Sequence, residues 1–166
     1  MRVVALVAVL GLALAGSAGA RPAAAPTCTT VSPATVQAAL GGSMQATPGT
    51  SNSKISGLSY LGCTYSATAN ISFISPDTSS AFASLLAMLK KATKVSTVTG
   101  IGTSAFSGTG SNTSSTCVPG GKCTQKTVTT QNLWVYVAGK AVFEISASGV
   151  TLGREESLAK TMVKLV

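Results

Sequence analysis

Histidine is absent from this 166-residue chain, and acidic side chains number only four. The absence of histidine removes the commonest general base and the Ser-His and Cys-His nucleophile pairs. Three of the acids (Asp77, Glu155 and Glu156) stand where helices are expected to begin, which leaves Glu144 alone, whereas a glycosidase needs two facing carboxylates. Without histidine or a CxxC pair, the cysteines do not resemble a metal site either. We therefore expect a protein that is not an enzyme and that holds no metal or cofactor.

Long apolar runs are also missing after the N-terminus. Met1-Arg2 precedes the apolar run Val3 to Leu14, and Ala18-Gly19-Ala20 fits the A-x-A pattern of a secretory cleavage site. A run of about a dozen residues is too short to span a bilayer core of about 30 Å. Cleavage after Ala25 is an alternative. The expected organisation is a signal peptide (1–20), a disordered Pro/Ala tether (21–27) and one secreted domain (28–166) without a transmembrane segment.

Four cysteines, Cys28, Cys63, Cys117 and Cys123, follow this leader. In an exported chain they predict two disulfides, for which three pairings are possible. We favour Cys28 with Cys63 and Cys117 with Cys123, because the last two bracket the turn-forming segment 118–122. The residues before Cys28 are not a lipobox, so free secretion is favoured over lipid attachment.

The stretch Thr127 to Ala147 gives the clearest structural signal. Two apolar runs, Leu133 to Val137 and Ala141 to Ile145, flank a glycine-containing turn, which predicts a β-hairpin. A three-residue loop, 137–139 with Gly139 left-handed, gives one wholly apolar face, made of Leu133, Val135, Ala141, Phe143, Ile145 and Ala147. A two-residue loop would invert every side chain.

The opposite face of this hairpin holds the candidate binding residues. We prefer the three-residue loop because it places Glu144 on the other side from Phe143. That other face then carries Trp134, Tyr136 and Lys140, and we expect it to be exposed. Amphipathic aromatics beside a cation are common at contact surfaces, so these three residues are the predicted binding site.

Three helices are expected around the sheet. Ser32-Pro33 begins a short helix that Gly41-Gly42 ends, and Ser75-Pro76-Asp77 begins a second with an apolar stripe that includes Phe82. Gly153 to Glu156 begins a third, whose apolar side includes Leu158. Residues 43–59 and 107–116 read as a loop and a low-complexity segment. We predict an α+β fold, with a small antiparallel sheet of about five strands and helices packed on one face, in the order α-β-β-α-β-β-β-α.

Several of these features together resemble a known family. They are Cys28 soon after the leader, a helix ending at Leu40-Gly41, and the segments Leu61-Gly62-Cys63-Thr64-Tyr65 and Gly100 to Phe106, followed by a terminal hairpin and helix. The chain is similar to actinobacterial secreted proteins and lipoproteins of unknown function whose fold resembles the extracellular sensor domain of a mycobacterial receptor kinase.

The resemblance implies a bridge from Cys28 to Cys63 and a helix-backed sheet. It carries no catalytic residue over to this chain. The chain departs from the family pattern in lacking a lipobox, in having Thr103 where an acid is common, and in the added pair Cys117 and Cys123.

Charge narrows the expected function. Without Arg2 the chain keeps eleven of its twelve basic residues against four acids, a net charge of about +7. This charge would attract an anionic envelope polymer, lipid headgroups or an acidic protein. The alternative is that it serves solubility alone. Nucleic acid is disfavoured, because basic residues are not interleaved with aromatics. We predict a secreted, non-enzymatic binding or sensor-like module at the cell envelope. The alternatives are a hydrolase with a Ser-Lys pair and an inhibitor or toxin that presents the Cys117 to Cys123 loop.

Overall fold

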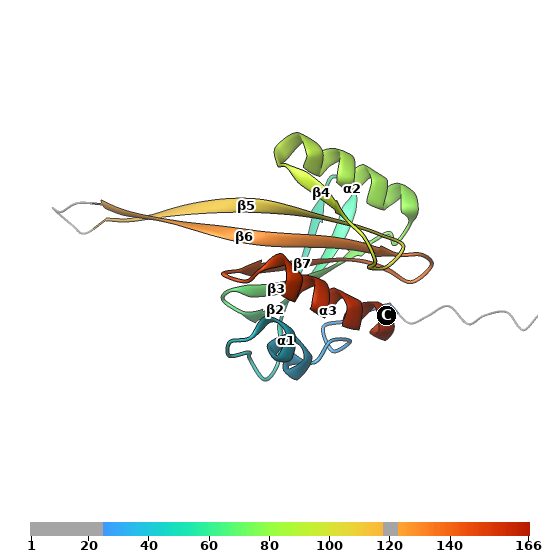
Figure 1. Ribbon diagram of the computed structural model, residues 1–166, viewed down its shortest axis with the longest axis horizontal. Helices are drawn as coiled ribbons and strands as arrows, with labels where there is room; N and C mark the ends of the chain where they lie inside the picture. Colours follow the sequence, from blue (N-terminus) through green and yellow to red (C-terminus); the bar gives the residue numbers. More distant parts are fainter. Residues whose placement is uncertain (1–24, 118–122) are drawn as a thin grey trace, which may run out of the picture.

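The computed structural model describes residues 25–117 and 123–166, without the side chains of residues 112–117 and 126. In this part of the chain seven strands form one antiparallel sheet in the order β1-β2-β3-β7-β6-β5-β4 (Figure 1). The strands are β1 Gly49–Ile55, β2 Leu58–Ser66, β3 Ala69–Ser75, β4 Val95–Val98, β5 Ser104–Cys117, β6 Cys123–Val137 and β7 Ala141–Ser148. The helices are α1 Pro33–Leu40, α2 Ser79–Ala92 and α3 Leu152–Leu165.

The fold is α+β, as predicted, but its element order differs from the prediction. Three strands precede α2 and four follow it, whereas two and three were expected. β1 was missed because its sequence, GTSNSKI, has no apolar alternation and every residue of the strand is exposed. β5 was read in large part as a low-complexity segment, because Ser, Gly, Thr and Asn make up most of it. Both segments become strands through pairing with a neighbour, which composition does not reveal.

Two helix starts show how local chemistry sets the boundaries. At α1 the prediction is confirmed: the Thr35 main-chain N–H donates to the Ser32 hydroxyl at 3.1 Å, and Gly41 ends the helix with φ of 79°. At α2 the predicted start at Ser75 is wrong. Thr78 caps this helix by accepting from the Ala81 N–H at 3.2 Å, so the chain continues for three residues beyond β3 before it turns helical.

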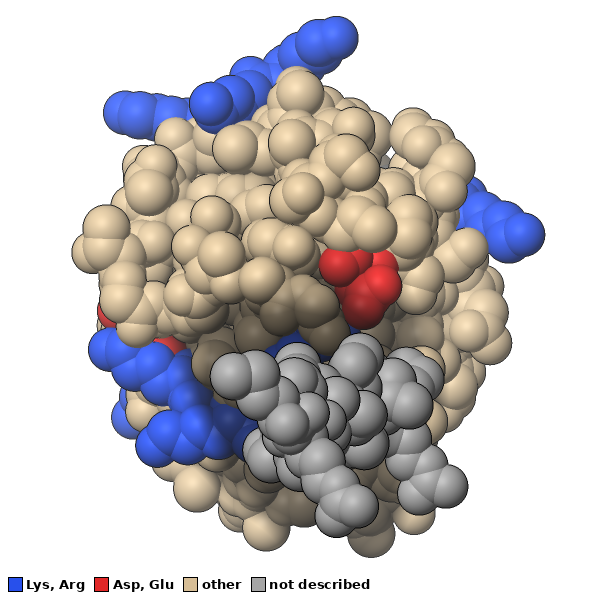
Figure 2. Space-filling view, turned by 90° about the vertical axis from the view of Figure 1, so that its right-hand side faces the viewer, with Lys and Arg blue, Asp and Glu red and all other residues tan. Residues whose placement is uncertain are grey.

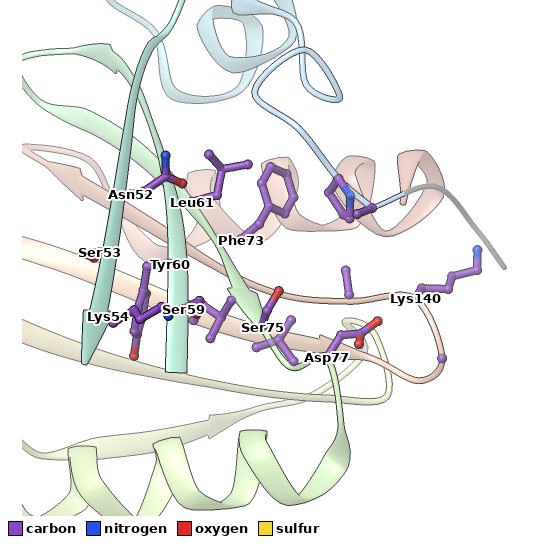
Figure 3. Close-up of a pocket in the computed structure, with 16 residues that line it drawn as sticks. Asn52, Ser53, Lys54, Ser59, Tyr60, Leu61, Phe73, Ser75, Asp77 and Lys140 are labelled. Carbon is purple, nitrogen blue, oxygen red and sulfur yellow. The ribbon is translucent and has the colours of Figure 1, made fainter. Parts of the chain in front are cut away.

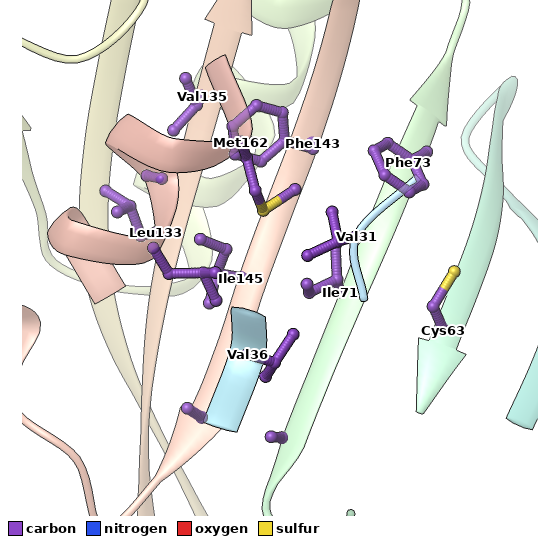
Figure 4. Packing of buried hydrophobic residues seen from close by; sticks show 14 of the residues in the cluster. Val31, Val36, Cys63, Ile71, Phe73, Leu133, Val135, Phe143, Ile145 and Met162 are labelled. Carbon is purple, nitrogen blue, oxygen red and sulfur yellow. The ribbon is translucent and has the colours of Figure 1, made fainter. Parts of the chain in front are cut away.

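Helices α1 and α3 cover one face of the sheet and form the larger core with it (Figure 1). Met162 of α3 and Val36 of α1 lie over Phe143 and Ile145 of β7 (Figure 4), and all four side chains are buried. Because every second residue of a strand points to the same side, β3, β6 and β7 each contribute alternate residues to this core. The apolar face predicted for the hairpin is therefore the floor of this core.

Helix α2 packs on the opposite face, so the prediction of helices on one face only is wrong. Phe82 and Leu85 of its stripe are buried there against Phe106 and Val142, in a second apolar cluster. This face carries enough apolar area to require a cover of its own, because Ile74, Phe106, Trp134 and Val142 lie on four different strands. A sheet with two apolar faces needs a helical layer on each.

The hairpin of β6 and β7 has the predicted faces, with the loop one residue further along. Val137 pairs with Ala141, and Leu133 pairs with Ile145, so residues 138–140 form the three-residue loop. Gly139 has φ of 68°, as the turn requires.

The disulfide between Cys28 and Cys63 is present as predicted. Cys117 and Cys123 are cross-strand partners at the far ends of β5 and β6, and Cys123 is disulfide-bonded; the side chain of Cys117 lies outside the described residues. The predicted signal peptide and residues 21–24 of the tether also lie outside them. Residues 25–27, expected to be disordered, have defined positions, and the Thr30 N–H donates to the Thr27 carbonyl at 2.9 Å. No described helix has the length and apolar character to cross a bilayer.

Candidate functional site

Two of the three predicted binding residues are packed under α2 and do not form an exposed surface. Trp134 is only 4% exposed, and its ring is stacked on Phe106 with centroids 5.1 Å apart. Tyr136 is partly buried, with its ring stacked on Phe82 of α2 at 5.6 Å. The predicted exposure is therefore wrong for Trp134, because this half of the face is covered by the α2 stripe.

Lys140 is separated from these aromatics and is exposed in the loop between β6 and β7. Its Nζ donates to the main-chain oxygen of Val166 at 2.9 Å. It also lines the largest cavity described for this molecule, at the end of the sheet where β2, β3 and β7 meet the residues before α1. Of the predicted site, Lys140 lines this cavity, and Trp134 and Tyr136 do not.

This cavity, which we call the end groove, has a volume of about 800 Å³ (Figure 3). Residues from β1, β2, β3 and β7 provide its floor, and Pro26 forms part of one wall. Its lining residues are Ala25, Pro26, Asn52, Ser53, Lys54, Ser59, Tyr60, Leu61, Phe73, Ile74, Ser75, Asp77, Gly139, Lys140, Ala141 and Val142. The volume lies within the range of small-molecule sites in proteins.

The floor of the end groove follows from the strand register. Asn52 pairs with Leu61, and Leu61 pairs with Phe73, so their side chains form one row across β1, β2 and β3. Figure 3 shows the three side chains pointing to the same side of the sheet. Phe73 is buried and Leu61 partly buried against the core below. The row is therefore apolar in the middle of the sheet and polar at the β1 edge.

Charged side chains stand at the two ends of this floor. Lys54 is at the β1 edge, directly opposite Ser59 in the register. Lys140, on the β6–β7 loop, and Asp77, on the segment that leads to α2, both line the other end (Figure 3). Seen from this end, the molecular surface is mostly uncharged, with basic side chains around its margin and an acidic patch beside a hollow (Figure 2). The groove thus combines an apolar floor with charged ends.

Glu144 lies on the α2 face, between the cross-strand partners Ser72 and Trp134. Burial raises the pKa of Glu144 to about 7, against a smaller lowering by a hydrogen bond from the Trp134 side chain. Burial and the charge of Glu144 together raise the pKa of Tyr60, which neighbours it on this face. A carboxyl with a pKa near neutrality can exchange a proton, but neither cross-strand partner of Glu144 is a second carboxylate.

Glu155 is on the other side of the sheet, in the first turn of α3, and has no exposed surface. Neither of its carboxyl oxygens has a hydrogen-bond partner. Burial raises the pKa of Glu155 to about 8, and the negative charge of Glu144 raises it further. The nearby main-chain N–H of Ala147 lowers this pKa in part, although it does not complete a hydrogen bond to either carboxyl oxygen. The sequence pattern places Glu155 where a helix begins but misses its burial, because the local sequence does not reveal how deeply α3 packs on the sheet.

The described residues contain no group of three or more His, Cys, Asp or Glu side chains that could hold a metal ion. Among the groove residues, sequence reasoning missed Asn52, Lys54 and Phe73. No local signal identifies them, since they come together only when β1, β2 and β3 pair in register.

No protein-family model matches this chain, and comparison with curated proteins and with solved structures gave no match either.

Proposed function

We propose that this protein is a secreted, non-enzymatic binding module of the cell envelope, and that the end groove is its ligand site. The observation that carries the proposal is the groove itself, about 800 Å³ in volume, with apolar side chains along its floor and cations at both ends. Small-molecule sites are typically concave and mostly apolar, with a few polar groups that orient the ligand.

Secretion is supported by the disulfide between Cys28 and Cys63, because such bonds persist in oxidising compartments. The resemblance to the extracellular sensor domain is consistent with a ligand-binding role. The expected positive charge would favour anionic ligands near the groove. The disulfide, the resemblance and the positive charge support the compartment and the class of protein, whereas the proposed ligand site rests on the groove.

The proposal is tested by filling the groove from its edge. Asn52 is exposed on β1, in the same row as Leu61 and Phe73, so a tryptophan in its place would lie over the apolar floor. The neutral fluorescent probe N-phenyl-1-naphthylamine should bind the unmodified protein. With Asn52→Trp we expect its affinity to fall by about tenfold, which corresponds to losing roughly 1.4 kcal/mol of apolar burial.

The matched control is Thr50→Trp. Thr50 is exposed on the same strand and the same face, but it pairs with Cys63 and does not line the groove. Its substitution should leave probe affinity unchanged. Equal probe binding by Asn52→Trp and the unmodified protein would show that the groove is not the binding site.

A further inference from the structure

We propose that the ligand of the end groove is a free single-chain amphiphile with an anionic head group, held with its head at Lys54 and its chain along Leu61 and Phe73. This inference rests on the proposed function above and adds the chemical class and the orientation of the ligand.

The shape of the floor favours a single apolar chain. Leu61 and Phe73 are direct cross-strand partners, so they form a narrow apolar path that runs across the strands. Pro26 borders the groove from the segment before α1. A ligand that lies along this path removes apolar surface from water over its whole length, and the stabilisation grows with each methylene buried.

The two ends of the path differ in their electrostatics. Lys140 already donates to the Val166 main-chain oxygen at 2.9 Å, so its ammonium group is partly engaged within the protein. Lys54 has no ion pair or hydrogen bond through its ammonium group within the described part of the chain. An anion at the Lys54 end therefore meets a cation that has no acidic neighbour to compete for it, which fixes the direction of the ligand.

Polar side chains near Lys54 supply further hydrogen bonds for a head group. Ser59 is its cross-strand partner, and Asn52 lies two residues away on the same face of β1. A hydroxyl and an amide can both donate to a carboxylate or sulfate oxygen. The β1 end of the groove thus offers a cation and two neutral donors, whereas the cation at the opposite end, Lys140, already donates to the Val166 main-chain oxygen.

The experiment compares n-alkyl carboxylates with n-alkanols of the same length by isothermal titration calorimetry, below the concentration at which the carboxylates form micelles. We expect affinity for both series to rise by about fourfold per added methylene until the chain fills the groove. We expect each carboxylate to bind about two- to fivefold more tightly than its alkanol, the range of one exposed ion pair.

Three charge-removing variants locate the head group. Lys54→Gln should abolish the preference for carboxylate over alkanol and leave alkanol affinity unchanged. Lys140→Gln should keep the preference. Lys94→Gln removes the same charge just after α2, on the opposite face of the sheet, and should also keep it, which controls for the net charge of the protein.

The possible failures separate the ligand class from the proposed function. If carboxylates and alkanols bind equally, or if Lys54→Gln keeps the preference, the proposed head-group site is wrong while binding in the groove stands. If the amphiphile binds only as part of anionic vesicles, the ligand is a membrane surface and the inference is overturned. If Asn52→Trp binds every chain as tightly as the unmodified protein, the groove itself is excluded.

Discussion

Glu155 is one of only four acidic residues in the chain, and its carboxyl is fully buried without a hydrogen-bond partner. Its pKa is raised to about 8 from an ordinary 4.5, so between these two values the unfolded chain has lost the proton and the folded chain keeps it. A folded state that binds more protons loses stability as pH rises. The contribution of Glu155 is therefore most favourable below about pH 4.5 and declines up to about pH 8. Among the described residues, Glu144 acts on the Glu155 carboxyl from across the sheet. The guanidinium of the neighbouring Arg154 is engaged elsewhere, because it donates to the Leu40 carbonyl at 2.9 Å.

The substitution Glu155→Gln should remove most of this pH dependence. At pH 8 we expect the variant to be more stable than the unmodified protein by about 1 to 3 kcal/mol, the penalty of a buried group left unpaired. At pH 4 the difference should shrink or reverse, because a buried neutral amide also lacks partners. Urea unfolding at both pH values measures the change.

Glu144→Gln is the comparison for that experiment. Burial raises the pKa of Glu144 to about 7, so its pH effect has the same sign but is complete about one pH unit lower. If the free energy of unfolding changes with pH equally in the unmodified protein and in Glu155→Gln, Glu155 has a hydrogen-bond or charged partner in solution and the prediction is wrong.

Single residues were predicted well only where their neighbours in sequence decide their environment. Lys140 follows the turn glycine and is exposed, as expected for a hairpin loop. Trp134 was placed on the correct face but expected in solvent, since Lys140 and Glu144 on that face suggested exposure. The cover over Trp134 comes from Phe82, 52 positions earlier in the chain, and only the packing of α2 brings them together.

Helix α2 is the element that converts this face from a surface into a core. Phe82 is buried between Phe106 and Tyr136, with centroid distances of 5.0 Å and 5.6 Å. Phe82→Ala should lower the free energy of unfolding by about 3 kcal/mol or more, as expected for a buried phenylalanine. It should also expose Trp134 to added quencher and shift its emission to longer wavelength.

The control at this scale is Leu165→Ala in α3, a side chain that is 49% exposed. It should change stability by less than about 0.5 kcal/mol and leave Trp134 fluorescence unchanged. Unaltered Trp134 emission in a folded Phe82→Ala protein would contradict the role of α2 as the cover of this face.

Elements with their own capping residues or apolar periodicity were predictable, and the others were not. α1 ends where Gly41 predicts, and the hairpin has the predicted faces. β1 is a fully exposed edge strand whose one large apolar residue, Ile55, stands at its end, so no apolar alternation marks it. Because the end groove depends on β1 for Asn52 and Lys54, missing this strand also meant missing the Lys54 end of the site.

The molecule as a whole is a sheet covered unequally on its two faces, and the end groove lies where the larger layer stops. The disulfide between Cys28 and Cys63 joins the segment before α1 to β2, and it is buried in the larger core. The Tyr65 hydroxyl donates to the Val31 carbonyl at 2.8 Å, which fixes the same segment from β2. Pro26, two residues before Cys28, is held against the groove by these attachments.

Removal of this disulfide should therefore affect both stability and the groove. The bridge closes a separation of 35 residues, and the chain-entropy relation gives a loss of roughly 3 to 4 kcal/mol for the double substitution Cys28→Ala and Cys63→Ala. Urea unfolding measures this loss. The affinity of the folded fraction for N-phenyl-1-naphthylamine should also fall, because Pro26 is no longer fixed at the groove wall.

The other two cysteines provide a control for position. Cys117 and Cys123 face each other at the far ends of β5 and β6, beyond the last pairs that β4 and β7 make, and are separated by few residues. Cys117→Ala with Cys123→Ala should cost less stability, because a short loop closes with a smaller entropy, and should leave probe affinity unchanged. If both double variants lose affinity equally, the attachment of Pro26 does not shape the groove. If neither loses affinity, the floor of Leu61 and Phe73 binds the probe without that wall.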